Sequence, residues 1–314
     1  MKKLTAFFEL IRYKNLLFIV LTQLFFYGFI IRPSYQKILS NPPLLSQDLF
    51  HWMLVASILI AGGGYIINDY FDLNIDKINK PERLIVDKEI SRRWAMMLHF
   101  MMSISGLVIT GFVSMKLNNF LLLLLNGIAV ILLWVYSTTF KKKLLTGNII
   151  ISVLTAWVIF MLFFAEISWS GGRLIPSSNL ALVSIYKLAI VYGGFAFIVS
   201  LIREVIKDIE DEIGDRKYGC TTMPIVWGVH ATKVFVAVWM ITLFGSLCAL
   251  MIYALFNKWY LVSVYIIYLL IFIYHIFNKL RTAKKIEDYT LLSRSVKILM
   301  LSGILSMVLY NFYF

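Results

Sequence analysis

Long apolar runs separated by short polar segments recur along the whole chain. Nine runs lie near residues 16–31, 51–68, 96–114, 119–137, 149–165, 182–202, 234–256, 259–277 and 296–313. Each approaches the ~20 residues that a helix needs to cross a bilayer. Backbone groups in lipid must be hydrogen-bonded within their own segment, and the alternation of a barrel strand is absent. The pattern therefore predicts an all-α, polytopic membrane protein with nine transmembrane helices.

Composition agrees with this prediction and excludes a soluble domain. Of the 314 residues, 60% are hydrophobic and only 15% are charged, and the mean hydropathy is +0.81. A soluble domain carries about 25% charged residues. The two cysteines imply no disulfide framework, and the four histidines lack the spacing of metal ligands.

The order of the runs predicts a single domain over residues 1–314. It has two four-helix halves, near 16–140 and 149–277, and a ninth helix at 296–313. The first run does not resemble a signal peptide, because it follows a polar start and no small-residue cleavage site comes after it. Residues 1–13 are expected to form a short amphipathic segment on the membrane surface.

Basic residues lie mostly on one side of the predicted membrane. With alternate loops assigned to opposite sides, 24 of the 30 lysines and arginines fall on the side of the N-terminus. The positive-inside rule makes that side the cytoplasm and places the protein in the cytoplasmic membrane. The net charge of +13 does not indicate nucleic-acid binding, because basic and aromatic residues are not interleaved. No obligate protein partner is inferred.

Acidic residues gather in two clusters, just past the cytoplasmic ends of the second and sixth runs. Of 17 carboxylates, six lie within 69–89 and six within 204–215. A continued helix would align Asn68, Asp72 and Asp76 on one face, and Asp208, Asp211 or Glu212, and Asp215 on another. Aligned like charges repel, and Mg²⁺ shared with a phosphorylated substrate would offset the repulsion. Nearby basic residues would hold the phosphate oxygens; the candidates are Arg83, Lys141, Arg203, Lys207 and Arg216.

A simpler interpretation makes both clusters solvated loop charges, but two matched clusters at equivalent depth argue against it. A glycine run, Gly62, Gly63 and Gly64, precedes the first cluster. It either cradles a phosphate or allows close helix packing.

Three motifs give the chain a family resemblance. "NDYFDLNID" at 68–76, "DEIGD" at 211–215 and "YSTTFK" at 136–141 resemble the motifs of the UbiA superfamily of intramembrane prenyltransferases. The resemblance implies nine helices around a central cavity that opens near the cytoplasmic face. The longer strings "NDYFDLNIDKINKPER" and "REVIKDIEDEIGDRKYG" most resemble the branch that geranylgeranylates geranylgeranylglyceryl phosphate.

The resemblance also implies roles for individual residues. Tyr136 would face the cavity near the reacting carbon, whereas Asp69 points to another face of its helix and receives less weight. Mg²⁺ would be bound by Asn68, Asp72, Asp76, Asp208, Asp211 and Asp215. Diphosphate would be bound by Asn68, Arg83, Lys141 and Arg216. Lys207 is a further candidate because it lies within the second acidic cluster. The catalytic set would be Asp72, Asp76, Tyr136, Asp211 and Asp215.

The expected reaction is Mg²⁺-dependent transfer of a prenyl group from an allylic diphosphate to a lipid acceptor. An aromatic acceptor of the 4-hydroxybenzoate, dihydroxynaphthoate or homogentisate type is the alternative. The segments "ERLIV" and "CTTMP" depart from the family pattern and leave the acceptor open. A transporter is disfavoured because ionisable residues of transporters tend to lie near the bilayer midplane. The third possibility is a non-catalytic membrane scaffold, which would release no diphosphate from an allylic diphosphate.

Overall fold

The structure is a computed structural model that describes residues 2–38, 42–79, 81, 84–167 and 180–313. Its regular elements in this part of the chain are helices, and nine of them are long and apolar enough to cross a membrane. The predicted all-α fold with nine spans is confirmed. The central cavity stays a prediction.

The chain divides into two compact units. Unit 1 comprises Met1–Lys141 and Trp157–Ala189, and unit 2 comprises Lys142–Ala156 and Ile190–Phe314. The single domain with two four-helix halves stays a prediction.

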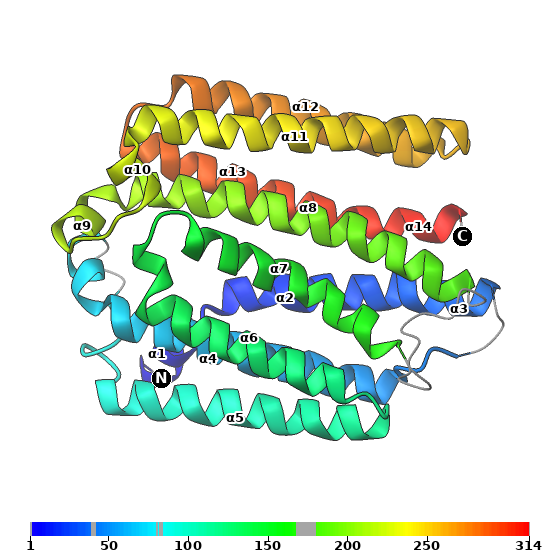
Figure 1. Cartoon of the computed structure of the whole chain (residues 1–314), viewed down its shortest axis with the longest axis horizontal. Coiled ribbons are helices and arrows are strands. Elements are labelled where there is room, and N and C mark those ends of the chain that lie inside the picture. The colour runs from blue at the N-terminus through cyan, green and yellow to red at the C-terminus, as the bar shows by residue number, and fades with distance from the viewer. Residues whose placement is uncertain (1, 39–41, 80, 82–83, 168–179, 314) are drawn as a thin grey trace. The chain divides into compact units, whose positions relative to one another are not determined.

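Unit 1 holds the first four spans (Figure 1). Its helices are α1 (Lys2–Leu10), α2 (Tyr13–Phe25), α3 (Arg32–Ile38), α4 (Gln47–Asn79), α5 (Arg92–Lys116) and α6 (Phe120–Thr138), with the end of α7 (Thr146–Ala165) and the start of α8 (Leu180–Glu210). A π-helical turn at Phe26–Ile31 joins α2 to α3, so that both form one span. The segment predicted over 1–13 is helical as α1. α4 extends eleven residues beyond the predicted run, to Asn79, and the first acidic cluster therefore begins on a helix.

Small residues bring α4 and α5 together along their lengths. A Cβ on Gly63 would lie 2.7 Å from Ser103 Oγ, and one on Gly106 would lie 2.7 Å from Ile60 Cγ1. His99 on α5 also bonds the Gly63 carbonyl through Nδ1, at 2.9 Å. The glycine run therefore serves close helix packing, the second of the two interpretations, and this contact holds the α4 segment just before the acidic motif.

A buried carboxylate ties the other end of unit 1. Glu166 follows α7 and accepts backbone N–H bonds from Leu44 at 2.9 Å and Leu45 at 3.1 Å. Burial raises the pKa of Glu166 to about 7, even though both amide donors favour the charged form. Tyr27 donates to the Leu45 carbonyl at 2.9 Å, which completes the anchor.

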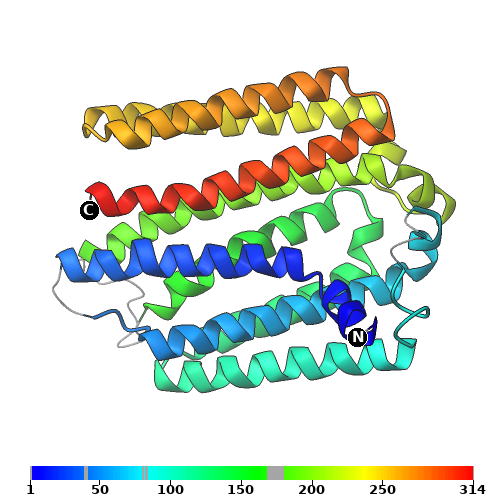
Figure 2. The same ribbon diagram turned by 180° about the vertical axis from the view of Figure 1, so that it is seen from behind.

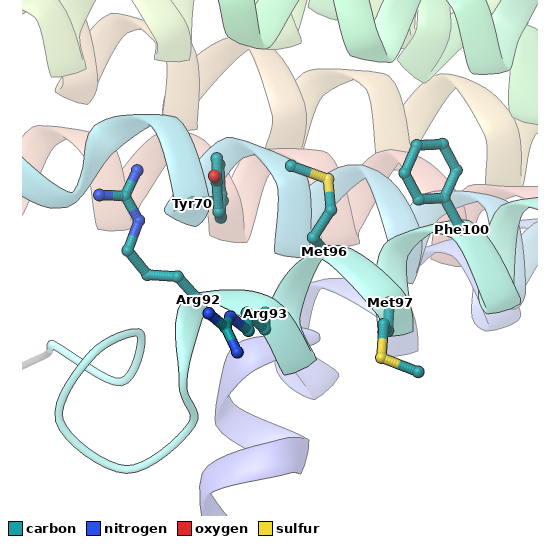
Figure 3. A pocket seen from close by; sticks show the side chains of 6 residues that line it. All are labelled: Tyr70, Arg92, Arg93, Met96, Met97 and Phe100. Atoms are coloured by element: carbon teal, nitrogen blue, oxygen red, sulfur yellow. The ribbon is translucent and has the colours of Figure 1, made fainter.

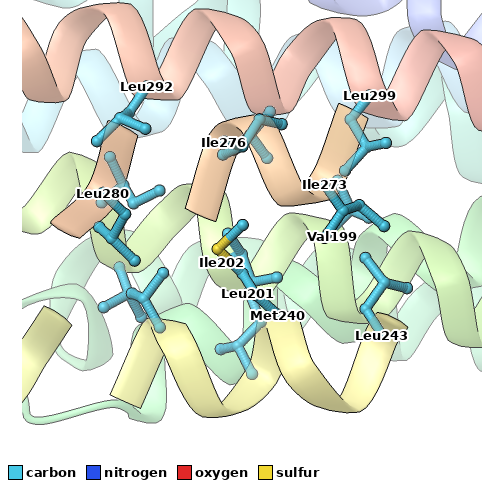
Figure 4. Packing of buried hydrophobic residues seen from close by; sticks show 14 of the residues in the cluster. Val199, Leu201, Ile202, Met240, Leu243, Ile273, Ile276, Leu280, Leu292 and Leu299 are labelled. Carbon is cyan, nitrogen blue, oxygen red and sulfur yellow. The ribbon is translucent and has the colours of Figure 1, made fainter. Parts of the chain in front are cut away.

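Unit 2 is built around a continuous apolar core. It holds the start of α7, most of α8, and α9 (Glu212–Lys217), α10 (Met223–Val226), α11 (Gly228–Phe256), α12 (Tyr260–Thr282), α13 (Ile286–Leu305) and α14 (Tyr310–Tyr313). Figure 2 shows α11 and α12 as an antiparallel pair. Buried side chains of α8, α11, α12 and α13 interdigitate, among them Ile202, Met240, Ile273 and Leu292 (Figure 4). The last span begins at Ile286, ahead of the predicted 296, because a polar first turn precedes its apolar part.

Candidate active site

The first acidic motif lies on the last turns of α4, in unit 1. Because α4 is unbroken, Asn68, Asp72 and Asp76 share one face, as their spacing predicted. Asn68 and Asp72 are buried, and Asn68 Nδ2 donates to Asp72 Oδ2 at 2.7 Å. Asn68 Oδ1 is buried and has no hydrogen-bond partner in the described structure. A buried, unpaired amide oxygen is costly, which indicates a ligand at this position.

Lys141 supplies positive charge beside Asp72. It lies in a 3₁₀ turn (Phe140–Lys142) after α6, and its Nζ forms an ion pair with Asp72 Oδ2. Burial alone would lower the pKa of Lys141, but neighbouring Asp72, Tyr136 and Asp76 raise it above its ordinary value. The structure thus brings five of the predicted residues together within unit 1: Asn68, Asp72, Asp76, Tyr136 and Lys141.

Asp69 faces another side of α4, as expected. Its Oδ1 accepts from Arg12 Nη2 at 2.5 Å, and the Arg12 guanidinium lies 5.4 Å from the Tyr65 ring centroid. The charge of Asp69 raises the pKa of Arg12, and Asp72 adds to this effect. Arg12 is not among the site residues predicted from the sequence. Its signal was a basic residue directly before the first span, on the side of the membrane predicted for the motif.

The second acidic motif lies in unit 2, where α8 passes into α9. α8 ends at Glu210 and α9 begins at Glu212, so the predicted single helix is interrupted at Asp211. The interruption is local, because the Asp211 amide donates to the Lys207 carbonyl and the Asp215 amide to the Asp211 carbonyl. Both bonds keep the four-residue step of an α-helix.

Asn148 holds Asp208 of the second motif. Asn148 lies at the start of α7 and donates through Nδ2 to Asp208 Oδ2 at 2.8 Å. Asn148 and Asp215 are buried. Asn148 closely follows the "YSTTFK" motif, but no role was predicted for it from the sequence. Each acidic motif therefore contains an aspartate bonded by an asparagine amide.

The basic residues predicted near the second motif are paired with acidic neighbours. Glu204 accepts from Arg203 at 2.8 Å and from Lys207 at 3.1 Å. Arg216 pairs with Glu212 at 2.6 Å on an exposed surface. A diphosphate would have to share or displace these carboxylates. Arg83, the remaining basic candidate, lies outside the described residues.

The donors of the first motif suit a hard divalent cation. Mg²⁺ prefers carboxylate and amide oxygens, keeps several waters and is commonly shared with substrate phosphates. Two or three protein oxygens are then sufficient. Asn68 Oδ1 and the carboxylates of Asp72 and Asp76 provide such oxygens, and Lys141 adds a cation for an anionic substrate. Chemically, the arrangement can hold a phosphorylated group and stabilise negative charge that develops on it.

Comparison with known proteins gives consistent matches. The model of the UbiA prenyltransferase family matches residues 38–298. A digeranylgeranylglyceryl phosphate synthase from Methanococcus maripaludis is 32% identical over 93% of this chain and 93% of its own length. A protein of the same name from Methanospirillum hungatei is 33% identical over 69% of this chain and 70% of its own length.

Solved structures show the same fold. A structure described as a digeranylgeranylglyceryl phosphate synthase in membranes has a TM-score of 0.63, is 24% identical, and the match covers 99% of each chain. A UbiA homologue from Archaeoglobus fulgidus bound to GPP and Mg²⁺ has a TM-score of 0.59, is 19% identical, and the match covers 96% of this chain and 99% of the other.

Proposed function

This chain belongs to the UbiA prenyltransferase family, and from that premise we propose that it geranylgeranylates geranylgeranylglyceryl phosphate. The donor is geranylgeranyl diphosphate, and diphosphate is released. The name shared by relatives at 33% and 32% identity supports this acceptor over an aromatic one. The protein acts as an integral membrane enzyme of the cytoplasmic membrane, with its N-terminus and both acidic motifs on the cytoplasmic side.

We assign the diphosphate-binding chemistry to the acidic motifs. Asn68, Asp72 and Asp76 hold Mg²⁺, and the second motif has the same role through Asp208, Asp211 and Asp215. When bound, Mg²⁺ neutralises charge on the diphosphate as it leaves. Lys141 holds a phosphate oxygen, and its raised pKa keeps it charged. Lys207, Arg216 and Arg83 are proposed as further diphosphate ligands.

The reaction exchanges one C–O bond for another. The bond between the allylic carbon and the diphosphate oxygen breaks, and the electron pair leaves with diphosphate. The ring face of Tyr136 stabilises the cationic carbon, an interaction worth up to about 2 kcal/mol when desolvated. The acceptor hydroxyl then attacks that carbon, the ether bond forms and the hydroxyl proton is released.

The observation that carries this proposal is the arrangement of Asn68, Asp72 and Lys141. A buried carboxylate takes both an amide donor and a cation, while the amide oxygen beside it has no partner. Phosphoryl-handling sites need this combination of oxygen ligands for Mg²⁺ and a fixed positive charge.

The test compares two aspartates of the same helix. Asp72→Asn should lower kcat at least about a hundredfold, because it removes electrostatic stabilisation of the leaving group. Asp69→Asn is the matched control, since Asp69 faces Arg12, and should keep kcat within about tenfold. Purified enzyme is assayed with geranylgeranyl diphosphate, Mg²⁺ and a panel of glycerol-phosphate and aromatic acceptors. Full activity of Asp72→Asn would contradict the role proposed for Asp72 at the diphosphate. Prenylation of aromatic acceptors alone would contradict geranylgeranylglyceryl phosphate as the acceptor.

A further inference from the structure

A surface hollow of about 340 Å³ lies at the start of α5 in unit 1 (Figure 3). It is lined by Tyr70, Arg92, Arg93, Met96, Met97 and Phe100. None of these side chains belongs to the face of α4 that carries Asn68, Asp72 and Asp76. The hollow is therefore distinct from the site proposed for diphosphate, although α4 contributes Tyr70 to it.

The polar end of the hollow carries the positive charge of two arginines. Arg92 and Arg93 are exposed in the first turn of α5, and neither forms an ion pair with another described residue. The Arg92 guanidinium lies 4.8 Å from the Tyr70 ring centroid, which holds it over the hollow. Two guanidinium groups at the start of a long helix favour a phosphate group, since the helix dipole adds positive potential there.

The opposite end of the hollow is apolar and points along α5 into the membrane span. Met97 and Phe100 are 50% and 47% exposed. The Phe100 ring packs against Trp134, with ring centroids 5.6 Å apart, and against its chain neighbour His99, at 5.2 Å. This end belongs to the candidate membrane span Arg92–Lys116, which would place it against hydrocarbon rather than water. A hydrocarbon chain can therefore continue from the cationic end.

We infer that this hollow binds an anionic phospholipid of the membrane. Arg92 and Arg93 hold the phosphate, and an acyl or prenyl chain lies along Met96, Met97 and Phe100. The inference does not depend on the identity of the prenyl acceptor. It has a structural consequence, because the lipid contacts both helices of the α4–α5 pair near the end of α4 that carries the first motif. Bound lipid should therefore hold α4 and α5 together.

The experiment measures lipid retention by the full-length protein. Wild type is reconstituted in nanodiscs of phosphatidylcholine alone or of equal parts phosphatidylcholine and phosphatidylglycerol, then extracted and examined by native mass spectrometry. The test variant is Arg92→Gln/Arg93→Gln. The matched control is Lys279→Gln/Arg281→Gln, which removes two exposed basic residues at the end of α12, on the same predicted side of the membrane. Thermal unfolding in phosphatidylcholine alone confirms that each variant is folded.

Wild type and control should retain phosphatidylglycerol, and the test variant should retain at least about tenfold less, since it loses two charge-assisted contacts. Phosphatidylglycerol should raise the unfolding temperature of wild type and control but not of the test variant. Inorganic phosphate and glycerol phosphate, which lack a hydrocarbon chain, should not compete.

Equal retention by the test variant would overturn the proposal. An equal loss in the control would do the same, because it would assign binding to general surface charge. Full competition by inorganic phosphate would also overturn it, by making free phosphate the ligand. Arg92→Lys/Arg93→Lys should retain more lipid than the glutamine variant, because charge is kept while the bidentate geometry is lost.

Discussion

Replacing Lys141 with Gln removes the cation that neutralises the buried carboxylate of Asp72. The side chain of Asp72 is only 3% exposed, whereas that of Lys141 is 31% exposed. The substitution therefore leaves a buried, poorly hydrated charge, and the Asn68 amide is its remaining hydrogen-bond donor among the described residues.

The expected loss of stability follows from this burial. Removing one partner of a buried ion pair costs about 3–5 kcal/mol. We expect about 3 kcal/mol for Lys141→Gln, at the low end of that range, because the lysine end of the pair is partly hydrated and Asn68 still donates to Asp72. Asp72→Asn should cost less, about 1 kcal/mol, because the unpaired Lys141 can turn toward water.

A double-mutant cycle isolates the interaction. The variants Lys141→Gln, Asp72→Asn and the double variant are unfolded in mixed micelles by an SDS titration, with helicity as the readout. The double variant should be more stable than the sum of single effects predicts, with a coupling of about 2 kcal/mol. All three variants should lose prenyl transfer, since the proposed function assigns both residues to the diphosphate site.

If the effects of the two single substitutions on the free energy of unfolding were additive, the expected coupling would be refuted. A coupling below about 0.5 kcal/mol would mean that Lys141 and Asp72 do not stabilise each other in the folded protein. Stability restored in the double variant without activity would separate the folding role of the pair from its role in catalysis.

Three further outcomes are expected. As pH rises from 4.5 to 7, the free energy of unfolding of the wild type should fall by about 3 kcal/mol, because folded Glu166 keeps a proton that the unfolded chain releases. Glu166→Gln should remove this pH dependence when unfolding is measured across the same range. Gly106→Ala should cost about 1–3 kcal/mol, because its Cβ would meet Ile60 Cγ1 at 2.7 Å, whereas Gly245→Ala, with no atom within 4 Å, should not destabilise in the same assay. Chelation by EDTA should abolish diphosphate release and added Mg²⁺ should restore it, and undiminished release in EDTA would contradict Mg²⁺ dependence.

Local sequence features were sufficient to predict the membrane spans and the position of the first motif at the end of a helix. Crossing a bilayer needs a long apolar helix, and hydropathy along the chain reports this directly. A four-residue spacing places Asn68, Asp72 and Asp76 on one face of any continued helix, and α4 continues to Asn79. The family motifs then indicated the chemistry, because they combine candidate Mg²⁺ ligands with nearby cations.

Pairing between distant residues was decided by the tertiary structure alone. Lys141 pairs with Asp72 and Asn148 with Asp208 across 69 and 60 positions, and Arg12 pairs with Asp69 rather than with Asp72 or Asp76. Sequence spacing fixes the face of a helix on which a side chain lies, but which partner meets it depends on how separate helices pack. Hydropathy does not encode which partner a side chain meets, because side chains of similar polarity lie at several helix ends and give the same hydropathy pattern.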